Sequence, residues 1–277
     1  MNKAYIIGSG SIACRHSRIL NRLGYQACCV TSRISKLEHL YHKNDFAKIY
    51  PNIPRLENDS DIYVVANSTH LHTKTIKTIL ALECDKRQVY CEKPGPSEDF
   101  GVVVLYNLEH LPIIHRSAKK MVKLVHNADA KRWPSDIKWN ERYIFREKLG
   151  GGAAKTHSHE IVRAHYSRTL ESGLKLKKEN EKLMTDIDGK MVQTAIDLVG
   201  ENITINLNIT AKRPQRYWEW EDLIVFFYGK EPENKDKKEI YRVSTDEVNH
   251  THENMWVNFL KERNFEKTDL SWVHTYG

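Results

Sequence analysis

The chain has 277 residues, of which 40% are hydrophobic and 29% charged, enough for two modest domains that each bury a core. It contains no run of about 18 apolar residues that could span a membrane, and its first residues, MNKAYIIGSG, enter a strand pattern without a cleavable signal. We therefore expect a cytoplasmic protein with no membrane partner.

The net charge is +7, and lysine and arginine gather in two segments, AKKMVKLVHNADAKR and KLKKENEK. Acidic or apolar residues interrupt both segments, so we expect solvent-exposed helix faces and no nucleic-acid partner. A mildly positive field also suits an anionic cofactor or substrate. All five cysteines lie in the first third without a zinc-like spacing, which predicts buried free thiols and no metal site.

Short apolar runs alternate with helical patterns over the first 110 residues. The pattern predicts strands over 3–8, 26–32, 61–68 and 87–93, and helices over 11–24 and 72–83. The first helix has four apolar residues on one face: Ile12, Ile19, Leu20 and Leu23. Near-continuous apolar strands separated by amphipathic helices predict a doubly wound parallel sheet, that is, a Rossmann dinucleotide-binding domain over residues 1–112.

The second half of the chain has a different pattern. After the glycine cluster LGGGAA, β-rich runs follow one another through short turns such as VGEN at 199–202, which favours antiparallel pairing. The charged segment 230–239 is expected to be a loop, with YRVS at 241–244 resuming the sheet. Residues 113–277 are thus predicted to form an α+β domain with an open, mostly antiparallel sheet for substrate binding and oligomerisation.

A glycine motif follows the first strand directly. Gly8, Gly10 and Ala13 in IIGSGSIA form G-x-G-x-x-A at the start of a helix. Gly8 permits a tight turn, Gly10 lets the backbone approach a pyrophosphate, and Ala13 allows close helix packing. A purely structural glycine turn is the alternative. The predicted cofactor-binding residues of this turn are Gly8, Ser9, Gly10, Ser11 and Ile12.

The second strand ends in CCVTSR, without the Asp or Glu that NAD-preferring sites place there. Ser32 and Arg33 could instead donate hydrogen bonds to a 2′-phosphate. This favours NADP as cofactor, with NAD as the alternative, unless Arg33 is merely exposed after the strand.

The chain resembles the glucose-fructose oxidoreductase and inositol dehydrogenase superfamily of NAD(P)-dependent sugar oxidoreductases. Four segments carry the resemblance in the family's order: IIGSGSIA, VVANSTHLH, CEKP and YNLEHLP. The segment WPSDIKWNERYIFREKLGGGAAKTHSHEI is similar to the branch found beside bacterial surface-polysaccharide genes. Later, DGKMVQTAIDLV and HENMWVNFLKE look like the family's central strands and late helix.

The resemblance implies the site residues. Lys93, in the E-K-P motif, would lie beside the nicotinamide, bind the substrate oxygen and assist proton movement. His159 would be the second catalytic residue, as acid or base. Further cofactor contacts would come from Asn67, Ser68, His72 and Glu92 in addition to Lys93, and substrate contacts from Asn107, Tyr143 and His157 in addition to Lys93 and His159.

The chain departs from the family pattern at three positions. Thr156 and Val162 stand where the family has acidic residues near the histidine, and Glu109 replaces an arginine. The stretch from Pro94 to Asn107 is also too short for the family's full helix and strand together. These departures bear on whether turnover is retained.

The predicted function is NADP-dependent hydride transfer to or from a sugar, nucleotide sugar or sugar acid, in a homodimer or homotetramer and in surface-polysaccharide synthesis. One alternative is a cofactor-binding regulatory or structural protein without turnover. Another is a reductase of an imine or tetrapyrrole, which would have an apolar substrate cleft.

Overall fold

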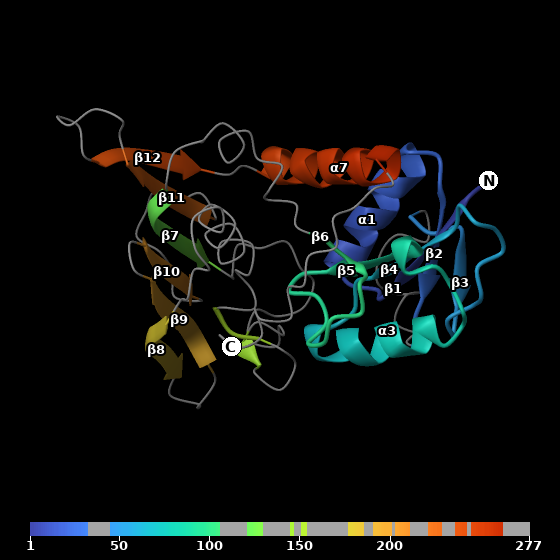
Figure 1. The fold of residues 1–277 in the computed structure, drawn as a ribbon, viewed down its shortest axis with the longest axis horizontal. Coiled ribbons are helices and arrows are strands. Elements are labelled where there is room, and N and C mark those ends of the chain that lie inside the picture. The colour runs from blue at the N-terminus through green and yellow to red at the C-terminus, as the bar shows by residue number, and fades with distance from the viewer. Residues whose placement is uncertain are drawn as a thin grey trace. The chain divides into compact units, whose positions relative to one another are not determined.

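Two separate sheets organise the chain (Figure 1). The computed structural model describes residues 1–32, 45–105, 121–129, 145–146, 151–153, 177–185, 191–200, 203–210, 221–228, 236–242 and 245–262. The chain divides into two units. The first unit consists of residues 1–107 and 249–272, and the second of residues 108–248 and 273–277.

Six parallel strands form the sheet of the first unit. They are β1 (Lys3–Ile7), β2 (Gln26–Val30), β3 (Lys48–Tyr50), β4 (Ile62–Val65), β5 (Val89–Glu92) and β6 (Val103–Leu105). Their order in the sheet is β3-β2-β1-β4-β5-β6, and every neighbouring pair is parallel. This confirms the predicted Rossmann doubly wound sheet. No helix separates β5 from β6, as the short stretch after Pro94 indicated.

Helices cover both faces of this sheet. They are α1 (Ser11–Arg22), α3 (His72–Leu80) and α7 (Thr245–Glu262), with short 3-10 turns η1 (Thr69–Leu71) and η2 (Lys86–Gln88). Figure 1 shows α1 and α7 on one side of the strands and α3 on the other. The four central strands, β2, β1, β4 and β5, are almost wholly buried because both of their faces are covered, whereas the edge strands β3 and β6 are partly exposed.

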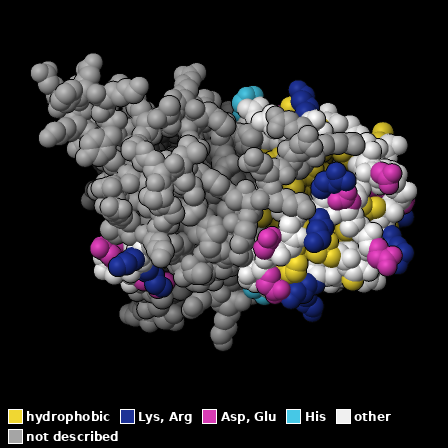
Figure 2. Space-filling model, viewed as in Figure 1, with side chains coloured by type: hydrophobic (Ala, Val, Ile, Leu, Met, Phe, Trp, Pro, Cys, Tyr) yellow, Lys and Arg dark blue, Asp and Glu magenta, His cyan; other side chains and the backbone are white. Residues whose placement is uncertain are grey.

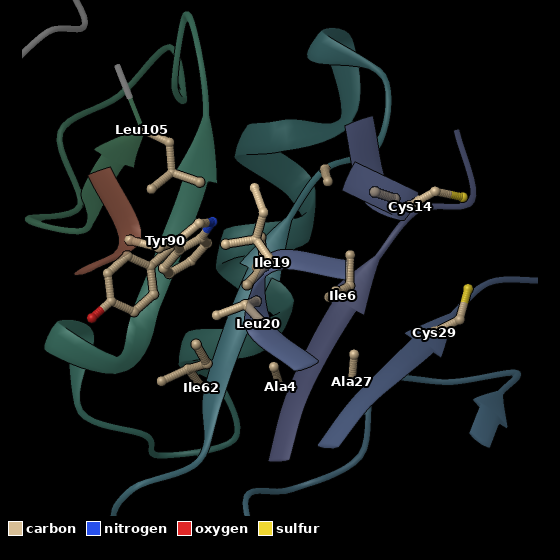
Figure 3. Packing of buried hydrophobic residues seen from close by; sticks show 14 of the residues in the cluster. Ala4, Ile6, Cys14, Ile19, Leu20, Ala27, Cys29, Ile62, Tyr90 and Leu105 are labelled. Carbon is tan, nitrogen blue, oxygen red and sulfur yellow. The ribbon is translucent and has the colours of Figure 1, made fainter. Parts of the chain in front are cut away.

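The core has two halves, one on each face of the sheet. On the α1 side, Ile19 and Leu20 pack over Ala4, Ile6 and Ile62 of the strands (Figure 3). On the α3 side, a second cluster contains the neighbouring strand residues, which point to the opposite face: Tyr5, Ile7, Tyr63, Val65, Val89 and Cys91. This alternation places successive side chains of β5 on opposite faces of the sheet.

Helix α7 belongs largely to the first unit, although it lies near the end of the sequence. Met255 and Trp256 are fully buried in the same cluster as Tyr90, whose ring centroid is 5.0 Å from that of Trp256. Burying a side chain of this size stabilises a fold by roughly 1.5–3 kcal/mol. The sequence analysis placed this helix in the second domain by its position along the chain. The predicted boundary at residue 112 lies outside the described residues.

The second unit has a mixed sheet of six strands. They are β7 (Met121–Asp129), β8 (Lys177–Thr185), β9 (Met191–Gly200), β10 (Ile203–Thr210), β11 (Glu221–Tyr228) and β12 (Asp236–Arg242), in the order β12-β11-β7-β10-β9-β8. All neighbouring pairs are antiparallel except β7 and β10, which are parallel. The predicted open, mostly antiparallel sheet is confirmed.

Three local predictions in this half were wrong. Most of the two lysine-rich segments expected to be helix faces forms β7 and the first residues of β8, because pairing with neighbouring strands overrides the helix propensity of lysine and glutamate. The end of the expected 230–239 loop forms the start of β12. Both β8 and β12 are edge strands among the described strands, where a charged sequence is common.

Of the helices in the described part of the chain, none combines the length and the apolar character that a membrane span requires.

Candidate functional site

The candidate site is the edge of the first sheet where β1, β4 and β5 end. The chain winds outward from β1 to β2 and β3, and then continues on the other side of β1 with β4 and β5. Ligands of open α/β sheets bind at this reversal, beyond the carboxyl ends of the strands. The residues that follow β1, β4 and β5 are therefore the ones to consider.

The turn after β1 requires glycine at its first position. Gly8 has a φ of +132°, and a Cβ on it would lie 2.5 Å from the carbonyl oxygen of Ala66. Its amide donates to the Val30 carbonyl at 3.1 Å, so the turn is fixed between β2 and β4. No side chain could be accommodated there.

Gly10 and the start of α1 face open space. Among the described residues, a Cβ on Gly10 would meet no atom within 4 Å and no side chain caps the helix, while Ala13 is fully buried. The first turn of α1 contains no acidic residue. Uncapped amide groups at a helix N-terminus suit an anion such as a pyrophosphate. Ser9, Ser11 and the partly exposed Ile12 lie along the same turn.

The residues after β4 include an unpaired polar atom. The Asn67 side chain donates from Nδ2 to Thr75 Oγ1 at 2.8 Å, but its Oδ1 is buried and has no hydrogen-bond partner in the described part of the protein. Such an orphaned acceptor costs free energy unless a ligand or water satisfies it. The atom lies just beyond the carboxyl end of β4, so it fits a ligand hydroxyl. Ser68, the next residue, is partly exposed.

His72, the first residue of α3, connects the ends of β4 and β5. Its Nε2 lies 3.1 Å from the Asn67 carbonyl oxygen and its Nδ1 lies 3.2 Å from the Gly95 carbonyl oxygen. Both oxygens are acceptors, so the ring donates to one of them when neutral and to both when protonated. His72 is buried and thus holds two segments of the site together.

Lys93 lies in a tight turn at the end of β5. The Gly95 amide donates to the Glu92 carbonyl at 3.0 Å, which closes the turn, and the Lys93–Pro94 peptide bond is cis. The Lys93 side chain is half-buried. Its position at the carboxyl end of a parallel strand is the one that the motif predicted, while its catalytic role stays a prediction.

Glu92 directs its side chain toward α1 and α7. The carboxylate is nearly buried, and its Oε1 lies 2.7 Å from His16 Nε2. Burial raises the pKa of Glu92, but the hydrogen bond from His16, together with the charges of His252 and Lys93, outweighs it and lowers the pKa below the usual value. Glu92 therefore remains a carboxylate. Its predicted contact with a cofactor stays untested.

At the end of β2, the Thr31 amide donates to the Tyr50 carbonyl at 2.9 Å, and Ser32 follows with an exposed side chain. The other predicted site residues lie outside the described residues: Arg33, Asn107, Tyr143, His157 and His159. So do Thr156, Val162 and Glu109, the positions that depart from the family pattern. The half of the site expected around His159 is thus not placed.

The sequence analysis missed three buried residues of this region: His16, His252 and Trp256. A signal for His16 was present, because it occupies the apolar stripe of α1, four residues after Ile12 and four before Leu20. A histidine in such a stripe needs a buried partner. Nothing in the sequence marked Trp256, which lies 240 residues further on.

Among the described residues, no group of three or more His, Cys, Asp and Glu side chains could hold a metal ion.

Comparison with known proteins agrees with this geometry. Residues 3–100 match the GFO/IDH/MocA family model, described as an oxidoreductase family with an NAD-binding Rossmann fold. A search of curated proteins finds no match.

Solved structures share the fold over nearly the whole chain. One is a dehydrogenase (MviM) from Clostridium difficile, with 16% identity, a TM-score of 0.62, and coverage of 94% of this chain and 89% of that one. The WlbA (WbpB) dehydrogenase from Thermus thermophilus, solved with NAD and α-ketoglutarate, has 13% identity, a TM-score of 0.61, and coverage of 99% and 92%. A super-repressor mutant of Gal80p from Saccharomyces cerevisiae has 11% identity, a TM-score of 0.56, and coverage of 97% and 88%.

These identities establish a common fold and no more. Together with the glycine turn and the strand order, the matched segment identifies residues 3–100 as a Rossmann domain similar to the NAD-binding domain of the GFO/IDH/MocA oxidoreductases.

Proposed function

We propose that the protein is an NAD(P)-dependent oxidoreductase that transfers hydride to or from a carbon bearing a hydroxyl or carbonyl group, on a sugar, nucleotide sugar or sugar acid. The observation that carries the proposal is the position of Lys93. It lies at the carboxyl end of β5, in a turn hydrogen-bonded from Gly95 to Glu92, on the sheet edge that also carries the Gly8 turn. The same edge of the sheet thus carries a turn suited to bind an anion and the amine of Lys93.

The residues at this edge fit a dinucleotide. Gly8 leaves no room for a side chain, Gly10 faces open space, and the N-terminus of α1 has no acidic residue in its first turn. A bound nicotinamide dinucleotide would supply the hydride chemistry. The turn from Gly8 to Ile12 would hold its pyrophosphate, and the open Oδ1 of Asn67 would accept a hydroxyl hydrogen.

NADP is the proposed coenzyme because no carboxylate follows β2. Thr31 and the exposed Ser32 follow the strand, and Arg33 comes next in the sequence. A hydroxyl and a guanidinium suit a 2′-phosphate, whereas a carboxylate would repel it. The family description and the NAD in the Thermus thermophilus structure support nicotinamide dinucleotides in general.

Lys93 and His159 would manage the substrate oxygen. The ammonium group of the half-buried Lys93 can donate a hydrogen bond to that oxygen and polarise it, and a histidine titrates near neutral pH and can exchange the proton. Asn107, Tyr143 and His157 are proposed as further substrate contacts. Two dehydrogenases among the proteins of similar fold support this chemistry.

The second unit would bind substrate and join subunits. Its sheet is open, and β8 carries six exposed residues in the sequence KKENEK at one edge. Such charge opposes edge-to-edge pairing, so the proposed homodimer or homotetramer would form through the face of the sheet. Surface-polysaccharide synthesis is the proposed setting.

On the face of the first unit that Figure 2 shows, basic side chains do not dominate among the described residues. Figure 2 shows acidic and basic side chains interspersed on one face, and several are paired, including Lys77 with Glu98 at 2.7 Å. This favours a small-molecule partner over nucleic acid.

Calorimetric titration with NADPH and NADH tests the coenzyme, and a screen of sugar nucleotides and sugar acids for NADPH oxidation or NADP reduction tests the reaction. We expect binding of both coenzymes, tighter for NADPH, and turnover of at least one member of the panel. If the protein binds neither NADPH nor NADH, the proposal is refuted.

A second candidate is a coenzyme-binding protein without turnover. Gal80p, solved as a super-repressor mutant, shares the fold, and this chain departs from the family pattern at Glu109, Thr156 and Val162. Coenzyme binding with no turnover across the panel would favour this candidate.

A further inference from the structure

A buried chain of three polar side chains links α7 to the turn that carries Lys93. The Trp256 indole nitrogen donates to His16 Nδ1 at 2.9 Å, and His16 Nε2 lies 2.7 Å from Glu92 Oε1. His16 and Trp256 are fully buried, and Glu92 is 9% exposed. A second histidine, His252, packs beside them, with its ring centroid 5.9 Å from that of His16.

The hydrogen bonds fix the tautomer of His16. An indole N–H can only donate, so Nδ1 of His16 must accept and cannot carry a proton. The ring proton is therefore on Nε2, which donates to the Glu92 carboxylate. In a doubly protonated ring, the Nδ1–H donor would face the indole N–H donor, and the hydrogen bond between them would be lost. Through Trp256, helix α7 thus determines that His16 on α1 presents an N–H donor to Glu92 at the end of β5.

Glu92 transmits this constraint to the next residue. Its side chain is held by His16, and its carbonyl accepts from the Gly95 amide that closes the Lys93 turn. The far end of the turn is held by His72, which contacts the Gly95 carbonyl. Without the His16 N–H, a nearly buried carboxylate would lose a donor and have to find another, at the expense of the turn.

We infer that His16 is a positioning residue: with its tautomer set by Trp256, it holds Glu92 and thereby places Lys93 at the coenzyme edge. The inference rests on the proposed dinucleotide site. It explains why a polar ring occupies the apolar stripe of α1, where a leucine would fill the space without two buried hydrogen bonds.

Four variants test the inference. His16→Leu removes both hydrogen bonds, and His16→Gln keeps an N–H donor toward Glu92. Trp256→Phe keeps an aromatic ring beside His16 and removes only the indole N–H that donates to His16 Nδ1. The control is His250→Leu, which changes an exposed histidine on α7.

Three measurements are made on the purified full-length protein. Long-range proton–nitrogen NMR of ¹⁵N-histidine reports the His16 tautomer. Carbon NMR after reductive ¹³C-methylation of lysines reports the surroundings of Lys93, with the signal assigned by Lys93→Arg. Calorimetry measures the Kd of NADPH and of ADP-ribose, a probe that lacks the nicotinamide.

We expect the wild-type protein to show His16 protonated at Nε2 alone, and Trp256→Phe to show a mixture of tautomers. In His16→Leu the Lys93 signal should shift. The Kd of NADPH should rise roughly tenfold, which corresponds to the loss of one charge-assisted hydrogen bond. ADP-ribose should change by less than about twofold, because its phosphates lie at the Gly8 turn. His16→Gln should restore most of the NADPH affinity, and the control should match the wild type.

Equal weakening of NADPH and ADP-ribose in His16→Leu, or no rescue by His16→Gln, would reduce His16 to a packing residue and overturn the inference. So would a proton on Nδ1, or a Lys93 signal that His16→Leu leaves in place. If the wild type binds neither NADPH nor NADH, the dinucleotide proposal is wrong, and the tautomer and the Lys93 signal still decide whether His16 holds the turn.

Discussion

Substituting Gly8 with alanine should damage the fold itself, more than it damages coenzyme binding alone. The new Cβ would lie 2.5 Å from the Ala66 oxygen, 2.8 Å from the Ala66 carbon and 3.0 Å from the Asn67 nitrogen. All three atoms belong to backbone at the exit of β4, so β1 and β4 would have to separate. The φ of +132° adds strain of its own. Strain of about 1–3 kcal/mol and overpacking of similar size predict a loss of roughly 2–6 kcal/mol in unfolding free energy.

Two other glycines separate these causes. Gly24 has a φ of +89° with nothing within 4 Å of a Cβ, so Gly24→Ala carries backbone strain alone and should cost about 1 kcal/mol. Gly10 has neither strain nor a close neighbour, and Gly10→Ala at the start of α1 should cost at most about 1 kcal/mol. Gly10→Ala should nevertheless weaken NADPH roughly tenfold or more, since its methyl group would stand where the backbone meets the pyrophosphate.

Urea denaturation and calorimetric titration with NADPH measure the two effects separately. Gly8→Ala should have the largest loss of stability, and Gly10→Ala should lose affinity for NADPH with little loss of stability. Gly24→Ala should lose only about 1 kcal/mol of stability and keep the wild-type affinity. If Gly8→Ala were as stable as Gly24→Ala, the close approach of β1 and β4 would not constrain this turn, and the reasoning would be refuted.

Three further predictions concern the site. Lys93→Met should lower turnover of a confirmed substrate by roughly a hundredfold or more, whereas coenzyme affinity should change much less, by no more than about tenfold; a wild-type rate would make Lys93 an ordinary residue at the end of a strand. Arg33→Ala should weaken NADPH by roughly 1.5–3 kcal/mol and leave NADH nearly unchanged, as measured by calorimetry; an unchanged preference for NADPH would remove the argument from this residue. Because the pKa of Glu92 is lowered from its ordinary value of 4.5, its stabilising contribution is complete above about pH 4.5 and is lost as the pH falls below that value. The unfolding free energy of Glu92→Gln should therefore fall less between pH 5 and pH 3 than that of the wild type, and equal slopes would contradict the lowered pKa.

The parts of the fold that depend on local pattern were predictable. The strands of the first sheet are short, nearly continuous apolar runs, and the turn at Gly8 and Gly10 stands between a strand and a helix with a clear apolar stripe. Both signals arise within about 20 residues, where periodicity and glycine chemistry determine the structure. The position of Lys93 at the end of β5 was predictable for the same reason.

The failures come from contacts between distant residues. Lysine and glutamate in 177–182 favour a helix in isolation, but pairing with β9 makes this segment a strand. The partner of His16 on α7 lies 240 residues away, so no local pattern could reveal it. Periodicity predicted the stripe of α1 and left open why one of its members is a histidine.

The first unit is discontinuous in sequence, and this has a consequence for synthesis of the protein. Residues 1–107 leave the ribosome long before residues 249–272, which include Met255 and Trp256. Until α7 is synthesised, Tyr90 lacks its ring contact with Trp256 and His16 Nδ1 lacks its indole donor. The coenzyme domain therefore completes its folding late, after nearly the whole chain has been translated, and a fragment that stops at residue 112 would expose an apolar face prone to aggregation.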